Sequence, residues 1–188
     1  MSEILVNTIK KADGTGSITV PAETGTVLTS ASDIQSQALS DLPLCDAYIN
    51  SSTFNVSNGV MTKIAFDQAR SNSDASMLDG TNYRITVPVS GYYNTQVILL
   101  ADDVGSTLER VTTRIYKNGA SLGSISDVHM VSGTGKNATI SASLLLPLNA
   151  NDYLEIYASL SNDGTTQLRF YGEANGISAF QVTFVRPL

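Results

Sequence analysis

Few residues in this 188-residue sequence could do chemistry, and His129 is its one histidine. A Ser-His-Asp triad would have to use this histidine as its general base. Asp127 stands two residues earlier, and side chains two residues apart point the same way from a strand. We therefore expect His129 to be a surface or subunit-contact residue, and we expect no catalytic triad.

Asp102 and Asp103 form an adjacent pair of carboxylates after an apolar stretch. Two carboxylates can act as acid and base in glycoside hydrolysis, and loop carboxylates can bind calcium. Adjacent acidic residues in a loop are more typical of a solvated turn, and no ligand spacing links this pair to Asp127 or Asp163. We expect no catalytic residue, no bound metal and no cofactor.

Residues 132–136 (Ser-Gly-Thr-Gly-Lys) contain part of a phosphate-binding pattern. The full pattern requires Gly where Met130 stands, and Ser or Thr where Asn137 stands. The segment therefore predicts a polar surface loop that contains Ser132 and Thr134.

Composition favours an all-β protein and excludes several functional classes. Charged residues make up 15% of the chain, against about 25% in ordinary domains, while Ser and Thr together number 42. Short polar and β-branched residues favour strands and turns over helices. Eleven basic and seventeen acidic residues give a formal net charge of −6 without a basic cluster, so we expect no nucleic-acid binding.

The sequence also bears on membrane insertion, secretion and disulfide formation. No apolar run approaches the roughly 20 residues of a membrane span, so we expect no membrane insertion, and no signal peptide is visible. Cys45 is the one cysteine, which excludes an intrachain disulfide and indicates a small buried apolar residue. Stability must then come from packing or from association.

Residues 1–31 predict an extended, β-rich N-terminal arm. Short alternating stretches are separated by a glycine turn at 13–16, and a further strand is expected at 24–28. Three strands of about five residues cannot close a core, so the arm packs either on the following domain or on copies of itself. We favour the second.

Residues 32–43 predict a short helical linker or neck. Ser32 and Gln35 have the spacing of a capping box, and Pro43 ends the helix. The apolar stripe is thin, which favours a simple linker, with a three-helix neck on an oligomer axis as the alternative.

From residue 44 to 188, strands recur every 10–15 residues with turn signals between them. Period-two alternation is clear at 140–148, where leucines alternate with serines, and again at 153–160. The fold class expected is all-β, with a jelly-roll β-sandwich. The predicted strands are 44–50, 60–66, 83–89, 91–101, 108–117, 120–130, 137–148, 151–160, 165–171 and 178–187.

Several strings within this region resemble one known superfamily. They are Ile64–Asp67, the Pro-x-x-Gly-Tyr-Tyr corner at 88–93, the Lys-Asn-Gly turn at 117–119, the Asn-Asp-Tyr string at 151–153, and the aromatic strand Phe180–Phe184. Together they are similar to the jelly roll of the complement globular-head and tumour-necrosis-factor superfamily. The resemblance is strongest to versions at the ends of bacteriophage tail fibres and other virion surface proteins. The strings at 6–9 and 16–21 are similar to the starts of phage fibre proteins.

The resemblance implies a homotrimer on a virion surface, at the tail or the head, assembled in the host cytoplasm. The candidates for the subunit contacts, where aromatic residues are enriched, are Tyr92, Tyr93, Tyr157 and Phe180. Tyr92 and Tyr93 place one ring on each face of their strand, so we expect one of these two rings in the core and the other at a subunit contact. The arm would attach to other virion proteins. The apolar residues expected to make that attachment are Ile4, Val6, Ile9, Ile18 and Val20.

As a tail fibre or spike, the protein would bind a host receptor, either a cell-surface glycan or a protein. We expect the distal loops 102–107, 131–137 and 161–165 to make this contact. Their candidate ligand-binding residues are Asp102, Asp103, Ser132, Thr134, Asn162 and Asp163. Two alternatives stay open: a capsid decoration (cement) protein that stabilises the head shell, and, third, a polysaccharide depolymerase.

Overall fold

The computed structural model describes residues 8–10, 17–19, 42–105, 107–130, 136–164, 167–172 and 178–188. The chain divides into two compact units, Met1–Leu39 and Ser40–Leu188. The helix expected at 32–43 and the arm strand expected at 24–28 fall almost entirely outside the described residues, as do Ile4, Val6 and Val20.

The first unit contains a two-stranded antiparallel sheet, β1 (Thr8–Lys10) and β2 (Ser17–Thr19). Ile9 lies opposite Ile18 in the register. Two of the arm's predicted extended stretches therefore pair with each other.

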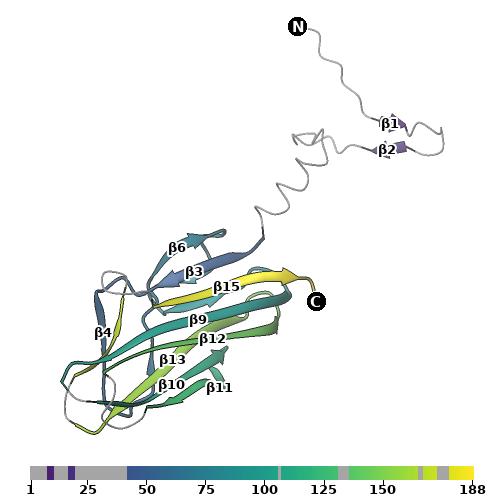
Figure 1. Ribbon diagram of the computed structural model, residues 1–188. Helices are drawn as coiled ribbons and strands as arrows, with labels where there is room; N and C mark the ends of the chain where they lie inside the picture. The colour runs from purple at the N-terminus through teal and green to yellow at the C-terminus, as the bar shows by residue number, and fades with distance from the viewer. Residues whose placement is uncertain are drawn as a thin grey trace. The chain divides into compact units, whose positions relative to one another are not determined.

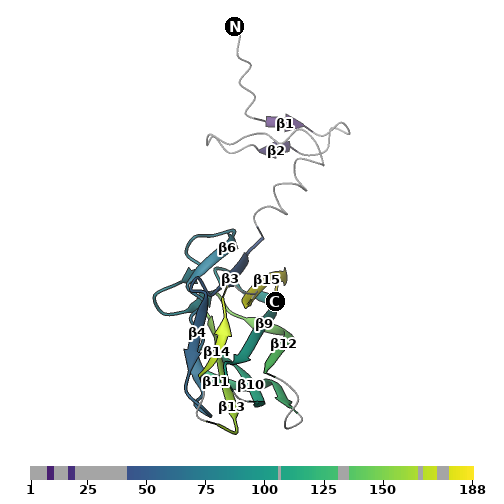
Figure 2. The same cartoon turned by 60° about the vertical axis from the view of Figure 1, so that its left-hand side comes forward.

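The second unit is built from two antiparallel sheets that form a sandwich (Figures 1 and 2). We call the first the β9 sheet; its order is β4-β14-β9-β15-β3-β6, and β12 pairs with the other edge of β9. Its strands are β3 (Leu44–Tyr48), β4 (Thr53–Val56), β6 (Gln68–Asn72), β9 (Gly91–Asp103), β12 (Asn137–Leu148), β14 (Leu168–Tyr171) and β15 (Ala179–Arg186).

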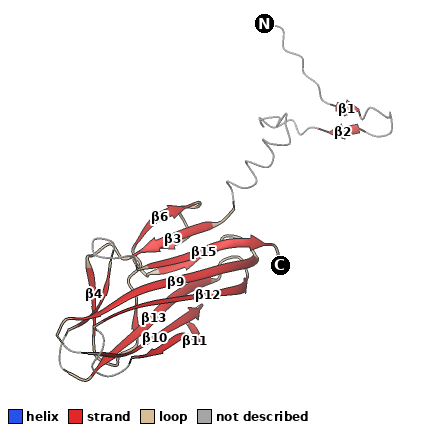
Figure 3. Cartoon of the chain, in the orientation of Figure 1, coloured by secondary structure: helices blue, strands red, loops and turns tan. Residues whose placement is uncertain are grey.

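We call the second the β13 sheet; its order is β11-β10-β13-β8-β7, and β5 also pairs with β13. Its strands are β5 (Thr62–Lys63), β7 (Leu78–Asp79), β8 (Arg84–Thr86), β10 (Leu108–Lys117), β11 (Ala120–His129) and β13 (Tyr153–Asn162). The described residues contain strands and loops without a helix (Figure 3). The all-β jelly-roll expectation is confirmed.

Alternation along the strands positions the core between the sheets. Leu154, Ile156, Ala158 and Leu160 of β13 are buried, as are the alternate residues Tyr93 to Ala101 of β9. Phe66 packs on Phe180 with ring centroids 5.7 Å apart. Cys45 is fully buried, and burial raises the pKa of its thiol to about 12. The expectation that Cys45 is a small buried apolar residue is confirmed.

The Pro-x-x-Gly-Tyr-Tyr corner turns the chain into β9. A side chain at Gly91 would collide with the Phe184 ring and would lie 2.8 Å from the Arg186 carbonyl oxygen, so only glycine fits. Tyr93 is buried, packs edge-on against Phe184, and donates its hydroxyl to the Val89 carbonyl at 2.8 Å. The tyrosine thereby fixes its own turn.

Two predicted turns, more than thirty residues apart, hold each other. Asn118 and Gly119 both have positive φ, as a tight hairpin between β10 and β11 requires. The Asn118 amide donates to Asp152 Oδ1 at 2.7 Å, and its oxygen accepts from the Tyr153 amide at 2.9 Å. Asp152 also accepts from the Asn149 amide and pairs with Lys117 at 2.7 Å.

These contacts define the charge state of Asp152. Burial alone would raise the pKa of this carboxyl, but hydrogen bonds from Lys117, Asn118 and Asn149 outweigh it and hold the pKa below its usual value. The lowered pKa means that the carboxylate stabilises the fold above about pH 4, and that this contribution disappears as the pH falls through the folded-state pKa.

We predict that Asp152→Ala lowers the free energy of unfolding by about 1–3 kcal/mol at neutral pH, because it leaves several donors without an acceptor. The difference from the parent should shrink in acid. Urea denaturation at pH 7 and at a series of lower pH values measures both effects. Asp74→Ala is the control, because Asp74 bonds to Ser76 within its own exposed turn. Equal losses in the two variants would refute the cross-turn role.

Candidate binding surfaces

The three predicted distal loops start and finish at one end of the sandwich. Asp102 lies opposite both Asn137 and Arg169 in the β9 sheet, and Leu108 lies opposite Asn162 in the β13 sheet. This end is the far end of β9 from Gly91, which lies beside Leu148. The described flanks of the loops therefore meet, as a shared binding surface would require.

Asp102 itself is not a loop residue, and that expectation is wrong. It belongs to β9, is 5% exposed, and is held by Arg169 at 2.8 Å and by the Tyr171 hydroxyl at 2.9 Å. With its amide nitrogen turned toward this carboxylate, Asn137 donates to the second oxygen. A buried carboxylate needs such partners, so Asp102 ties β14 and β12 to the end of β9 and is not presented to a ligand.

Asp103 is also a strand residue, and it is fully buried. Its Oδ2 accepts a hydrogen bond from the Asn162 amide at 2.7 Å, and Asn58 in turn donates to Asn162 Oδ1 at 2.7 Å. Asn162 is itself buried, so neither residue is presented to solvent. The sequence predicted these residues as loop ligands; instead they form a buried polar network that joins β9, β13 and the turn before β5.

Of the three remaining ligand candidates, the structure describes one. Asp163 is exposed, in the turn that follows β13. Ser132 and Thr134 lie outside the described residues. Among the described side chains, His, Cys, Asp and Glu do not gather in the groups of three that would hold a metal ion.

The four aromatic residues predicted at the subunit contacts do not lie together. Tyr93 and Phe180 belong to the core of the sandwich, so the prediction that they contact a second subunit is wrong. Tyr92 faces outward from the β9 sheet, beneath the Arg186 guanidinium at 4.3 Å. Tyr157 faces outward from the opposite sheet, where its ring stacks on Tyr116 with centroids 4.2 Å apart.

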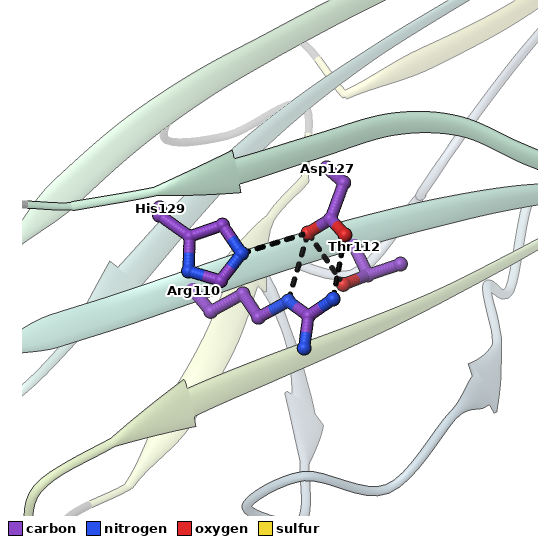
Figure 4. Close-up of polar contacts among 4 residues, drawn as sticks. All are labelled: Arg110, Thr112, Asp127 and His129. Atoms are coloured by element: carbon purple, nitrogen blue, oxygen red, sulfur yellow. Dashed lines mark hydrogen bonds and ion pairs between the residues drawn. The ribbon is translucent and has the colours of Figure 1, made fainter.

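The outward face of the β13 sheet carries a charged cluster (Figure 4). Arg110 and His129 are opposite each other in the register, as are Thr112 and Asp127. Arg110 binds Asp127 through two hydrogen bonds of 2.8 and 2.5 Å, Thr112 donates at 3.1 Å, and His129 Nε2 lies 3.8 Å away. Asp127 is thus committed to Arg110, and His129 is 70% exposed at the end of β11.

A Gly-x-Ser-x-Gly pattern occurs at Gly119–Gly123. It lies in the β10–β11 hairpin and not on the strand-to-helix turn that exposes a catalytic serine. Ser121 and His129 are eight residues apart on one strand, which separates them by roughly 26 Å. The pattern therefore supplies no nucleophile for His129. That the protein is not an enzyme stays a prediction.

We predict that Arg110→Gln raises the pKa of Asp127. The hydrogen bonds from Arg110 are the largest cause that holds this pKa at about 2, below its ordinary 3.8. Carboxyl-carbon NMR titration should find about 2 in the parent and a value closer to 3.8 in the variant. Lys136→Gln, which removes the same charge from an exposed site elsewhere, should leave Asp127 unchanged. An ordinary pKa in the parent would contradict the pairing.

Comparison with solved structures identifies the same fold in two animal proteins. The structure of Eiger TNF from S. frugiperda matches with a TM-score of 0.56 and 14% identity, over 79% of this chain and 95% of that one. The globular domain of zebrafish complement 1qA protein matches with a TM-score of 0.52 and 15% identity, over 76% and 96%. At such identities the likeness establishes a shared jelly-roll fold.

Sequence comparison adds no further assignment. No protein-family model matches the chain, and no curated protein matches it either. In the part of the chain that the structure describes, no helix has the length and apolar character needed to cross a membrane.

Proposed function

We propose that this protein is a homotrimeric binding module on a virion surface, a tail fibre or spike that acts in host-receptor binding. The observation that carries the oligomeric part is the contrast between the central strands of the two outward faces, which are uncharged along β9 from Tyr92 to Leu100 and charged at β13. The resemblance to the complement and tumour-necrosis-factor superfamily, whose members form trimers, supports it.

The outward face of the β9 sheet suits a subunit contact. Along β9 from Tyr92 to Leu100, the residues that point outward are Tyr92, Asn94, Gln96, Ile98 and Leu100, and none is charged. The ion pairs of this sheet lie away from that stretch, Arg70–Asp46 between β6 and β3 and Arg169–Asp102 at the far end of β9. Leu145 of β12 lies opposite Asn94 and is 56% exposed. An uncharged central stretch with exposed aliphatic and aromatic side chains is typical of the centre of an interface.

The β13 sheet differs because an ion pair, Lys63–Glu155, lies on its central strand. Its outward face carries the ion pairs Arg110–Asp127, Lys63–Glu155 and Arg84–Asp79. Charged residues are depleted at the centre of interfaces, so this face suits solvent or a polar ligand. A trimer joined through the β9 sheets would leave three β13 sheets outermost.

The virion assignment rests on the sequence strings that resemble phage fibre proteins, and both reported structural neighbours are animal proteins. In this proposal the arm that contains β1 and β2 attaches to another virion protein. Exposed Asp163 is then the described distal residue best placed to meet a receptor, while the buried Asp102 and Asp103 support the loops from beneath.

We predict that the parent is a trimer by multi-angle light scattering at micromolar concentration, and that Leu145→Arg shifts it to monomer. A charge in the middle of the contact would lose its hydration without a partner. Val60→Arg is the control, because Val60 is comparably exposed at 51% but precedes β5 of the other sheet. A monomeric parent would sink the proposal, and so would a trimer that Leu145→Arg leaves intact.

The site of action is tested by binding of the purified protein to host cells and to empty shells of the same phage. We expect saturable binding to cells that carry the receptor, because a fibre meets the host directly. Tight binding to shells with none to cells would instead identify a decoration protein and refute the receptor-binding role.

A further inference from the structure

We propose that the outward face of the β13 sheet holds a binding site for a sugar that bears a carboxylate, centred on Arg114 and the neighbouring ring pair of Tyr116 and Tyr157. The inference gives the proposed binding role a ligand class. It uses the face of a single subunit, so it does not depend on the trimer or on the virion assignment.

Arg114 is the uncommitted arginine of the described residues. The other five arginines each have a partner: Arg70 with Asp46, Arg84 with Asp79, Arg110 with Asp127, Arg169 with Asp102, and Arg186 over the Tyr92 ring. Among the residues that the structure describes, Arg114 has neither a carboxylate nor a ring partner, and its buried Nε has no hydrogen-bond acceptor there. A buried donor of this kind calls for an explanation.

A buried Nε without an acceptor does not by itself indicate a binding site, as a comparison with Arg84 shows. Its Nε is also buried without an acceptor, but its guanidinium is held by Asp79 at 3.1 Å and lies over the Tyr153 ring at 4.7 Å. Arg114 has no such anchor, so its guanidinium remains able to bind an incoming carboxylate in the two-point manner that arginine favours.

Two tyrosines are neighbours of Arg114 in the sheet. Tyr157 lies opposite Arg114 in the β10–β13 register, and Tyr116 is two residues further along β10 on the same face. Their rings stack with centroids 4.2 Å apart and planes inclined by 35°, and both side chains are partly exposed. Aromatic rings supply the apolar surface on which the C–H faces of a sugar ring pack.

Hydroxyl groups flank the same spot. Ser124 lies opposite Arg114 on β11 and is exposed, while Ser159 of β13 is partly exposed two residues from Tyr157. Hydroxyl donors and acceptors around an aromatic platform match the hydroxyl groups of a sugar. The face therefore combines the three elements that an acidic sugar requires.

Local charge favours an anion although the whole chain is negative. Around the tyrosine pair, Arg110, Arg114 and Lys63 are positive, whereas Asp127 and Glu155 are negative. Three positive minus two negative charges leave a local charge of +1, in a chain whose formal net charge is −6. His129 would add to the positive charge when protonated.

The backbone around the site argues against an acidic peptide. Both edges of β10 are paired, by β11 and β13, and both edges of β13 are paired, by β10 and by β5 with β8. A peptide therefore cannot add as a strand here, which is the usual way in which a sheet captures one. Rings, hydroxyls and a guanidinium are what remain for recognition.

The test compares a β-1,4-linked tetramannuronate with the matched neutral mannotetraose by isothermal titration calorimetry and saturation-transfer NMR. We expect the acidic tetramer to bind at least about tenfold more tightly than the neutral one. Arg114→Gln should remove at least about tenfold of that affinity and most of the preference. Arg70→Gln, which removes one charge from β6 of the other sheet, should retain both.

Two further variants keep the test decisive if Arg114→Gln fails to fold. Ser159→Glu adds a repulsive charge beside the site and should abolish binding of the acidic tetramer. Arg114→Lys keeps the charge and should weaken binding several-fold, because it loses the two-point contact.

Three outcomes would overturn the proposal: no binding of the acidic tetramer, equal binding of the two sugars, or parental affinity in the folded Arg114→Gln variant. Tetraglutamate that binds as tightly as tetramannuronate would also overturn it, in favour of an acidic peptide. Light scattering on the same samples reports the oligomeric state separately, so failure of the sugar site is distinguishable from failure of the trimer.

Discussion

The pairing of β9 is the interaction on which the rest of the structure depends. This thirteen-residue strand pairs along its whole length with β12 on one edge, and with β15 and then β14 on the other. Its inward side chains fill the core, while its outward ones are uncharged from Tyr92 to Leu100. One strand therefore organises the sandwich and also supplies the face that we assign to self-association.

The sequence predicted the strands with strong alternation and missed the weak ones. Leucines alternating with serines located β12, because a half-buried strand requires that period. The strands β4, β6 and β7 were missed. Gln68–Asn72 has Ala69 as its one apolar residue, so it shows no alternation, and its pairing with β3 depends on partners distant in sequence. The turns could be predicted because Asn and Gly tolerate positive φ. The hydrogen bond from Asn118 to Asp152 could not be predicted, because it joins two turns that are distant in the sequence.

The candidate site shows where reasoning from local sequence fails. Asp102 and Asp103 have the sequence character of a solvated loop, yet both are buried, because Arg169 and Asn162 supply partners from strands about sixty residues away. In the same way, Arg114 has no local signal. Every other described arginine has an anionic or aromatic partner, and Arg114 has none among the described residues. This difference depends on contacts between strands, so it cannot be found in the local sequence.

The account centres on a division of labour between the two outward faces, one covered by copies of the chain and the other left open. Hydroxyl-radical footprinting tests this most directly, because Tyr92 and Tyr157 are the same residue type, are both partly exposed in the subunit, and lie on opposite sheets. The account predicts slow oxidation of Tyr92 and fast oxidation of Tyr157 at high protein concentration, with Tyr92 becoming reactive on dilution. Slower oxidation of Tyr157 than of Tyr92 would contradict it.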